Sequence, residues 1–522
     1  MDGPKPARSD AGSMTLQRNH LLGIDLGAGS LKATIVHRDG SLAGEGSHPV
    51  ETRTPRFGWS EQDPDEWHRA LCRAVPAALA AARIAPGDIA AVGLSGGAHI
   101  PVLTDADDRP VQPAIMWNDQ RSAAEARELH DQAGELIIRS SLNRVNPTWS
   151  LPMLKWLQRH EPDAVARVRR LYISKDYLRT RLTGGWETDY SDVVGALMAD
   201  DRTRSWSPAL AALIGWPMES LPPVVRPTDV VGEVTAAAAR ETGLAAGTPV
   251  VCGSNDTTVE FFGVGAVAPG IGAIKVATAA VLFLATEGPS VNPPVSCYPH
   301  IVEGMYYTAT GTNSCASAHR WLRDNFFLPV LAGDGSAAFA EMDALAAGVA
   351  PGSEGLIFHP YLQGERAPYW DPLLRGDFIG MTMRHSRPHF ARALYEGIAY
   401  SIRDLLEAAR ALGLAFGAIK LMGGGARSAT WRQIIADVTG LAVERPGNGD
   451  ASFGAALVAG IGAGFYPDPK AAVAQCVTVL DRHDPDPARH ALYGELFGIY
   501  KQAQAALAPL NHRLHAIVEK VG

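Results

Sequence analysis

Short apolar runs that end in Gly, Ser, Asn or Asp recur along the chain, and this pattern predicts strands that stop at polar turns. The runs 21–26 and 31–36 flank a glycine-bearing turn and predict a hairpin. Segments with helical spacing lie between the runs, and Pro or Gly separates them. The predicted strands that follow the hairpin are 89–94, 249–252 and 419–422, and the predicted helices include 64–83, 165–182, 389–409 and 430–439. Alternation of this kind is typical of an α/β fold.

The second half of the pattern repeats the first. The run 273–284 predicts another hairpin, with Thr278 near its tip, and strands and helices alternate after it. A chain of 522 residues is also too long for one ordinary core. We therefore expect a disordered leader at 1–19, an N-terminal domain at 20–256 and a C-terminal domain at 257–510.

Composition narrows the choice of partners and compartment. The net charge is −8, and no run of Lys and Arg is longer than a pair, which argues against a nucleic-acid surface. The five cysteines form no CxxC pair, so neither a disulfide framework nor a zinc site is indicated from their spacing. No apolar run approaches the roughly 18 residues of a membrane span, and the N-terminus lacks the apolar core of a signal peptide. Small solutes as partners and a cytoplasmic location are the expectations.

The first hairpin carries groups that suit a phosphate. Gly27 allows close approach of the backbone N–H groups to an anion, while Ser30 and Lys32 add a hydroxyl and a cation. Asp25, at the end of the first strand, suits Mg²⁺, which prefers oxygen ligands. The alternative is a surface hairpin with a solvated aspartate. The glycine pattern is not a dinucleotide fingerprint, and the absence of any Gly-Lys pair excludes a Walker A loop.

The predicted strand 249–252 is followed by the turn Gly-Ser-Asn and then by Asp256, where a helix is expected to begin. A carboxylate at a strand end, with the hydroxyl of Thr278 on a nearby hairpin, suits chemistry on a phosphate. The alternative is that Asp256 only caps the helix, as Asp often does.

Two further polar clusters follow predicted strands. His99 comes after a glycine turn, and Trp117 and Asp119 follow a short apolar run. A Trp face with His and Asp is common where sugars bind; a structural histidine and a core tryptophan are the competing interpretations. At 423–428 three glycines precede a predicted helix, where backbone can meet a phosphate at the helix N-terminus; a turn without a ligand is the alternative.

Taken together, these residues resemble the FGGY family of carbohydrate kinases over most of the chain, from about residue 21 to 464. The segments that carry the resemblance are DLGAGSLK, GWSEQDPDEW, GLSGGAH, PAIMWNDQR, TDYSD, GSNDT, LQGERAPYWDP, 376–397 and GGGARSATWRQIIAD. The turn GWSEQDP, with SGGAH and WNDQR, is most similar to the xylulokinases of that family. The resemblance implies an α/β fold of two actin-like, ribonuclease-H-like domains with a cleft between them.

The resemblance also implies an activity and a set of residues. ATP is expected to phosphorylate a ketose, with D-xylulose giving D-xylulose 5-phosphate, in the presence of Mg²⁺, and a homodimer is suggested. Asp256 matches the general base and Asp25 the magnesium-associated acid. The remaining matches are Gly27, Ser30, Lys32, Thr278, Gly424, Gly425 and Ser428 toward the nucleotide, and Ala98, His99, Trp117, Asp119 and Asn255, with Asp256, toward the sugar.

Several positions depart from the family pattern. Ala28 replaces a threonine that is common in the first hairpin, and Ala277 and Ala279 flank Thr278 where GTS is common. The turn 95–99 lacks the long side chains of the similar xylulokinase turn. Alternatives are therefore an FGGY kinase for another pentulose, hexulose, polyol or sugar acid, an actin- or chaperone-like ATPase switch, and a regulator that binds sugar without phosphorylating it.

Overall fold

The computed structural model describes residues 18–291, 295–327 and 336–521. The chain forms two compact units that are interleaved in sequence. The first contains the residues up to Val267, with Cys297–Tyr306 and Asn448–Val477; the second contains Ala268–Ser296, Tyr307–Gly447 and Thr478–Gly522. The sequence-based division at residue 256 is a single cut, whereas the compact units exchange the chain several times. Of the expected leader, residues 1–17 lie outside the described residues.

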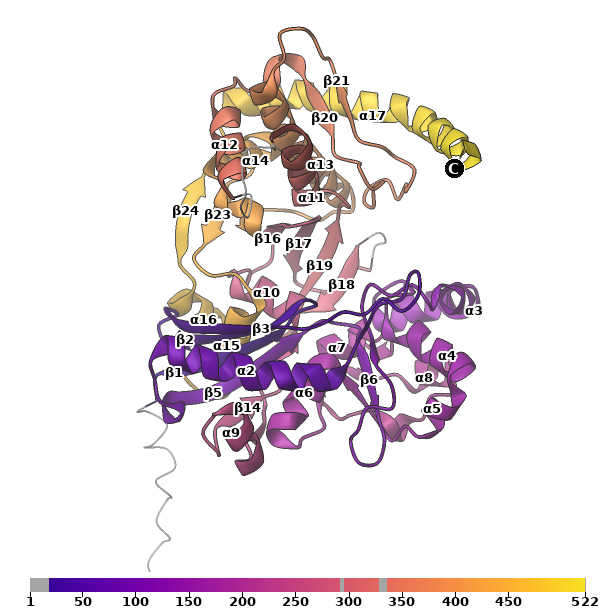
Figure 1. Ribbon diagram of the computed structural model, residues 1–522, viewed down its shortest axis with the longest axis vertical. Helices are drawn as coiled ribbons and strands as arrows, with labels where there is room; N and C mark the ends of the chain where they lie inside the picture. Colours follow the sequence, from indigo (N-terminus) through magenta and orange to yellow (C-terminus); the bar gives the residue numbers. More distant parts are fainter. Residues whose placement is uncertain (1–17, 292–294, 328–335, 522) are drawn as a thin grey trace, which may run out of the picture. The chain divides into compact units, whose positions relative to one another are not determined.

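A mixed sheet forms the centre of the first unit (Figure 1). The predicted hairpin is present, because β1 pairs antiparallel with β2 and β2 with β3. On the other side β1 pairs parallel with β5 and β5 with β14, and β13 closes this edge antiparallel to β14. The strands are β1 (His20–Leu26), β2 (Ser30–His37), β3 (Leu42–Pro49), β5 (Ile89–Gly96), β14 (Pro249–Val251) and β13 (Val230–Glu233).

Helices cover both faces of this sheet and bury two apolar clusters. On one face α2 (Pro64–Ala82) packs with α6 (Ser174–Thr183) and α9 (Ala236–Thr242). On the other lie α10 (Asp256–Gly263) and α15 (Ala451–Gly462). Contact with α15 is close, since a Cβ at Gly23 would lie 1.7 Å from the Ser452 carbonyl oxygen and one at Gly93 would lie 2.2 Å from that of Ala455. Glycine at these two sheet positions lets the helix reach the backbone.

The rest of the first unit is a helical region with short strands. Its elements are β4 (Glu61–Gln62), β6 (Pro101–Thr104), β7 (Ala114–Ile115), α3 (Ala123–Ser141), α4 (Ser150–His160), α5 (Pro162–Ala166), β8 (Arg170–Ile173), β9 (Thr188–Asp189), α7 (Tyr190–Gly195), β10 (Ala199–Asp200), β11 (Ser205–Trp206), α8 (Pro208–Leu213) and β12 (Val224–Val225). Outside this region, β15 (Ser254–Asn255) pairs parallel with β5 in the central sheet, α16 (Pro469–Cys476) packs beside α15, and the segment Cys297–Tyr306 contributes most of β18 (Ser296–Pro299). The helix predicted at 165–182 is wrong, because β8 interrupts it and pairs with β6. Propensity favours a helix there, but pairing with an apolar neighbouring strand overrides it.

The second unit repeats the strand pattern of the first. β16 pairs antiparallel with β17 and parallel with β22, β22 is parallel to β23, and β24 closes the edge antiparallel to β23. The strands are β16 (Ile271–Val276), β17 (Ala280–Thr286), β19 (Tyr306–Gly311), β20 (Ile357–His359), β21 (Asp377–Ile379), β22 (Ala418–Met422), β23 (Val443–Pro446) and β24 (Val479–His483). The predicted duplication is therefore confirmed at the level of sheet topology.

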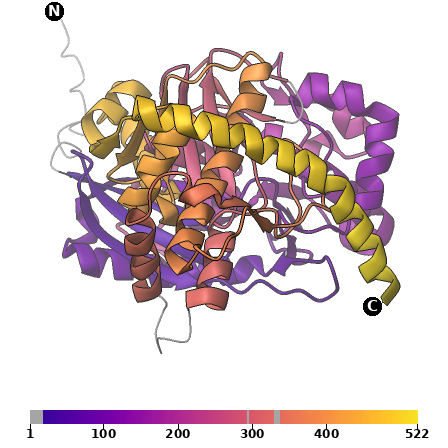
Figure 2. The ribbon, with the colours of Figure 1, turned by 90° about the horizontal axis from the view of Figure 1, so that it is seen from above.

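One apolar cluster holds the second unit together. Its helices are α11 (Ala316–Leu322), α12 (Ser336–Ala347), α13 (Arg387–Ala411), α14 (Ala429–Thr439) and α17 (Pro487–Val521). Figure 2 shows α17 as one long helix, and Tyr493, Phe497 and Tyr500 on it belong to the core. In the part of the chain that the structure describes, no helix combines the length and apolarity needed to cross a bilayer.

Candidate active site residues

The turn of the first hairpin is open to a ligand. Gly27 N–H donates to the Ser30 carbonyl oxygen at 3.0 Å, which closes the turn. A Cβ at Gly29 would meet no heavy atom within 4 Å, and Ser30 is exposed. The tip therefore has room for an anion beside its backbone.

Asp25 and Asp256 lie near each other in the first unit. Ser95 Oγ donates to Asp25 Oδ1 at 2.8 Å. Burial, followed by the charge of Asp256, raises the pKa of Asp25 to about 7, against the opposing effect of Ser95. Glu260 and Asp450 add smaller contributions in the same direction. An acid held this far above its usual range marks a place where a cation would stabilise the ionised form.

Asp256 begins α10, and its carboxylate is oriented locally. Its Oδ1 accepts hydrogen bonds from the backbone N–H of Thr257 at 2.6 Å and from Thr257 Oγ1 at 3.1 Å. The helix cap itself is Asn255, whose Oδ1 accepts from Thr258 N–H at 2.9 Å. The capping role that competed for Asp256 is thus carried by the preceding residue.

Lys32 is engaged by two carboxylates. Its Nζ lies 2.5 Å from Glu45 Oε1 and 2.6 Å from Asp450 Oδ2. Asp450 in turn accepts from Phe453 N–H at 2.9 Å and caps α15. Lys32 therefore joins the hairpin to the start of α15 within the first unit.

His99 sits in an aromatic setting with both ring nitrogens occupied. Nδ1 lies 2.7 Å from the Gly195 carbonyl oxygen and donates to it, so Nε2 accepts from Tyr298 Oη at 3.0 Å. The ring stacks on Trp149 with centroids 4.1 Å apart. Burial lowers the pKa of His99 to about 4, which keeps the imidazole neutral.

The other residues expected toward the sugar differ in accessibility. Trp117 is 49% exposed, whereas Ala98 is buried. Asn255 is buried, and its Nδ2 donates to Ser191 Oγ at 2.9 Å in addition to capping α10. Trp117 is the member of this set that presents the largest free face.

Asp119 is buried and fully bonded. Its Oδ2 accepts from Ser60 N–H at 2.6 Å and from an Arg121 guanidinium nitrogen at 2.8 Å, and its Oδ1 accepts from the Arg121 backbone and Nε. Arg121 also pairs with Glu61 at 2.8 Å. The carboxylate thus fixes the loop that carries Trp117.

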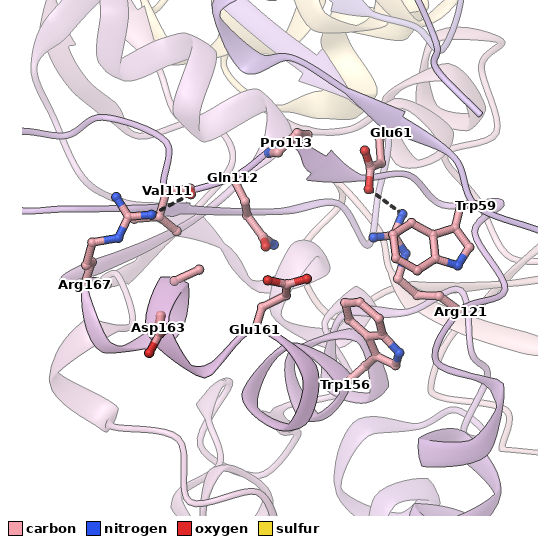
Figure 3. Close-up of a pocket in the computed structure, with 11 residues that line it drawn as sticks. Trp59, Glu61, Val111, Gln112, Pro113, Arg121, Trp156, Glu161, Asp163 and Arg167 are labelled. Carbon is pink, nitrogen blue, oxygen red and sulfur yellow. Dashed lines mark hydrogen bonds and ion pairs between the residues drawn. The ribbon is translucent and has the colours of Figure 1, made fainter. Parts of the chain in front are cut away.

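Arg121 borders a hollow of about 390 Å³ (Figure 3). Its guanidinium carbon lies 3.7 Å from the centroid of the Trp59 ring and 5.2 Å from that of Trp156. These three side chains lie together on one side of the hollow, and Arg167 lies on the other, where it donates to the Val111 carbonyl oxygen at 3.0 Å. Cation–π contacts hold the arginine that positions Asp119.

In the second unit, Thr278 lies at the exposed tip of the β16–β17 hairpin. Its carbonyl oxygen accepts from the N–H groups of Cys315 at 3.0 Å and Ser317 at 3.2 Å. Its Oγ1 accepts from an Arg320 guanidinium nitrogen at 3.1 Å. Sequence reasoning missed Arg320, because no local motif links the last turn of α11 to a hairpin about 40 residues earlier. Only its place on an exposed helix face hints at this contact.

In the glycine-rich turn 423–428 of the second unit, one glycine allows close packing and another leaves its backbone open to a ligand. A Cβ at Gly425 would lie 2.2 Å from Val276 Cγ1, so this glycine permits packing on β16, whereas a Cβ at Gly424 would meet nothing within 4 Å. Ser428 caps α14 by accepting from Trp431 N–H at 2.9 Å and donates to Asp343. The open backbone is therefore at Gly424.

A buried ion cluster behind Asp256 was also missed. Lys175 Nζ lies 2.6 Å from Asp176, 3.1 Å from Asp189 and 3.0 Å from Asp192, and all four side chains are fully buried. Asp189 Oδ2 also accepts from Ser254 Oγ at 2.8 Å, two residues before Asp256. The three acids raise the pKa of Lys175 well above its usual value despite burial. The charged run 174–179 gives the only sequence signal, and it resembles an ordinary exposed helix face.

Comparison with known proteins settles the family. Models of the N-terminal and C-terminal domains of the FGGY family of carbohydrate kinases match residues 20–263 and 272–463. The chain belongs to this family. The FGGY kinase is 31% identical to the xylulose kinase of Lactococcus lactis, covering 95% of this chain and 98% of that relative. It superposes on the crystal structure of a xylulose kinase from Rhodospirillum rubrum with a TM-score of 0.85 and 29% identity, covering 94% of this chain and 100% of the other.

A gluconokinase of Bacillus subtilis is also similar, at 26% identity over 90% of this FGGY kinase and 92% of the relative. The expected two-domain α/β fold and the expected carbohydrate kinase activity are thus confirmed. The FGGY kinase is an ATP-dependent sugar kinase.

Proposed function

We propose that this FGGY kinase phosphorylates D-xylulose to D-xylulose 5-phosphate. The similarity to xylulose kinases over nearly the full length of both chains supports this substrate. The observation that carries the mechanism is the pairing of Asp25 with Asp256 beside the open hairpin tip. A gluconokinase among the relatives makes a sugar acid the second candidate.

Asp256 is proposed as the general base. Its carboxylate takes the proton of the acceptor hydroxyl as that oxygen bonds to the γ-phosphorus of ATP, and the bond from phosphorus to the leaving ADP oxygen breaks. The hydrogen bonds from Thr257 fix one carboxylate oxygen and orient the other. Positioning of this kind supplies much of the acceleration in phosphoryl transfer.

Asp25 is proposed to hold Mg²⁺, directly or through water. The residues present fit a hard cation, because burial and the charges of Asp256, Glu260 and Asp450 raise the pKa of Asp25, and carboxylate oxygens are the ligands that Mg²⁺ prefers. A bound Mg²⁺ would supply charge neutralisation for the phosphates.

The nucleotide contacts are proposed at exposed backbone and hydroxyl groups of each unit. In the first unit these are Gly27 and Ser30, with Lys32 neutralising the acids that flank the hairpin. In the second unit Thr278, with Arg320 beside it, suits a phosphate, and Gly424 and Gly425 with Ser428 suit the remainder of the nucleotide.

On the sugar side, Trp117 is proposed to stack on the C–H face of the substrate. Ala98 and the neutral ring of His99 shape the adjoining surface. Asn255 and Asp119 are proposed to position the sugar site by bonding to backbone N–H groups. Asn255 accepts from Thr258 at the start of α10, and Asp119 accepts from Ser60. We further propose a cytoplasmic homodimer, which sedimentation of the purified chain would test.

The test is ADP release with MgATP and a panel containing D-xylulose, other pentuloses, hexuloses, polyols and gluconate, with a sugar-free control. A sharp response to D-xylulose is the expected result. A preference for gluconate would refute the substrate while keeping the kinase mechanism. Sugar-free hydrolysis with no response to the panel would refute the kinase assignment and favour an ATPase switch.

The same assay on Asp256→Asn tests the base. The rate is expected to fall about 10²- to 10⁴-fold, with ATP affinity nearly unchanged. Asp107→Asn, at an exposed aspartate of the same unit, is the matched control and retains the wild-type rate. Wild-type turnover by Asp256→Asn would remove Asp256 from this role.

A further inference from the structure

Three potential metal ligands meet on the α2 side of the first unit, on the face of the sheet opposite α10 and α15. His68 and Cys72 are four residues apart on α2 and therefore project from the same face of that helix. Glu241, on α9, reaches the same point. The ligand atoms of all three lie within 4.8 Å of one another.

Their spacing fits one small cation. The Cys72 sulfur lies 3.6 Å from His68 Nε2, and that nitrogen lies 3.0 Å from Glu241 Oε2. In a tetrahedral zinc site with ordinary bond lengths, sulfur and nitrogen are about 3.5 Å apart, and nitrogen and oxygen are about 3.4 Å apart. The sulfur–nitrogen distance already fits, and the nitrogen–oxygen distance must lengthen by a few tenths of an ångström.

The cluster is accessible, and room remains for a fourth ligand. Cys72 is the one cysteine of the five that is not buried, and His68 is half-buried. All three residues line a hollow of about 790 Å³, which His48 and Glu51 also line. Water from this hollow can therefore complete the coordination.

Charges of both signs line the hollow, with Arg69 and Arg73 beside Glu51, Glu66 and Glu241. Arg69 lines the same hollow but is paired with Asp63 at 3.3 Å and with Glu66 at 3.8 Å. Burial and the charge of Glu241 raise the pKa of Cys72, and the positive charge of Arg73, also on the hollow, acts in the opposite direction. A metal ion must therefore displace the thiol proton when it binds.

We propose that His68, Cys72 and Glu241 form a Zn²⁺ site that joins α2 to α9. Thiolate and imidazole select zinc over Mg²⁺, so the site is chemically distinct from the oxygen-rich surroundings of Asp25. The ion would replace the hydrogen bond between His68 and Glu241, and the thiol proton would pass to solvent. Among the described residues His68 Nδ1 has no acceptor, so the site lacks an outer contact that typically strengthens zinc binding by about 10- to 100-fold.

Titration of the full-length chain with Co²⁺ tests the site, because tetrahedral cobalt gives intense visible bands and a cobalt–thiolate bond gives a separate near-ultraviolet charge-transfer band. We expect one equivalent of Co²⁺ to produce both, and Zn²⁺ to abolish them. Cys72→Ser should remove the charge-transfer band, and His68→Ala should weaken binding about tenfold or more. His130→Ala, an exposed histidine on α3, should leave both signals unchanged.

The charge-transfer band distinguishes this site from cobalt bound at Asp25, where the neighbouring groups that the structure describes are the Ser95 hydroxyl and the carboxylates of Asp256, Glu260 and Asp450. Absence of the band in the wild-type chain, or its persistence in Cys72→Ser, would overturn the proposal. Circular dichroism and MgATP-dependent kinase activity of each variant show that it is folded. Glu241→Gln should also weaken Co²⁺ binding. Because Glu241 lies on α9, this variant leaves the sequence of α2 unchanged.

Discussion

At the scale of single residues, the most informative group is Asp25, because its ionisation is coupled to folding. Burial and the charge of Asp256 raise its pKa to about 7, whereas the unfolded chain has the ordinary value of 3.8. The folded state therefore keeps this proton between those two pH values. The stabilisation is complete below pH 3.8 and is lost as the pH rises to about 7.

We expect Asp25→Asn to remove this loss. In metal-free buffer, the free energy of unfolding of the variant minus that of the wild type should increase by about 2 kcal/mol from pH 4 to pH 8, a value reduced for partial exposure of the carboxyl group. Urea unfolding at each pH measures it. Burial of His99 gives a slope of opposite sign, since its pKa is lowered to about 4, but that slope is common to both proteins and cancels.

Asp107→Asn, at an exposed aspartate of the same unit, serves as the control. A flat difference for Asp25→Asn between pH 4 and pH 8 would contradict a raised pKa of Asp25 in the folded state. Addition of Mg²⁺ should reduce the slope, because a bound cation lowers the pKa of Asp25.

At the scale of elements, the buried cluster around Lys175 supports the strand and turn that precede Asp256. The contact from Ser254 to Asp189 ties β15 to this cluster. Removal of one partner from a buried ion cluster leaves uncompensated charge, which costs about 3–5 kcal/mol. The cluster therefore connects the stability of the first unit to the position of the proposed base.

Lys175→Met is accordingly expected to lower the free energy of unfolding by about 3–5 kcal/mol. The matched change at an exposed lysine, Lys470→Met, should stay within about 0.5 kcal/mol of wild type. Chemical denaturation of the three proteins compares them. Equal stability of Lys175→Met and wild type would show that the cluster contributes specificity of fold rather than stability.

Hairpins were the elements that the sequence predicted best. Alternating apolar residues around a glycine turn identified β1 with β2, and a polar tip identified β16 with β17. Local patterns of this kind contain the information for their own structure. The strand β8 was not predicted, because its pairing with β6 depends on a residue about 70 positions away and not on its own propensity.

In the candidate site, too, residues marked by a local pattern were predicted from the sequence, and residues defined by long-range contacts were not. Asp25 and Asp256 stand at strand ends, where position alone indicates chemistry, and the structure brings them together. The bonded state of Asp119 could not be predicted, because its partners Ser60 and Arg121 are recognisable only once the loops are folded. Arg320 and Lys175 were missed for the same reason.

At the scale of the whole molecule, the first unit depends on a segment that is distant in sequence. Residues 448–477 supply α15, which covers one face of the sheet and buries Leu21, Val36 and Val251. A fragment of residues 1–267 leaves this face exposed to water. The two ends of the unit in sequence are thus parts of one core.

We expect residues 1–267 alone to aggregate or to bind a dye for exposed apolar surface. The same fragment, with 448–477 attached through a flexible linker, should be monomeric and should unfold cooperatively. Size-exclusion chromatography and thermal denaturation distinguish the two. A linker-fused control in which Gly454 is replaced by Leu should fail, because even a Cβ there would lie 2.0 Å from the Val259 carbonyl oxygen.

The interleaved chain also has a consequence during synthesis on the ribosome. Between Val267 and Val477 the ribosome must add 210 residues, the difference of the two positions. At roughly 5–20 residues per second this takes roughly 10–40 s. During that interval α15 has not been synthesised, and the apolar sheet face that it covers in the folded unit is exposed in the nascent chain. A chaperone that recognises apolar surface can therefore bind this chain during that time.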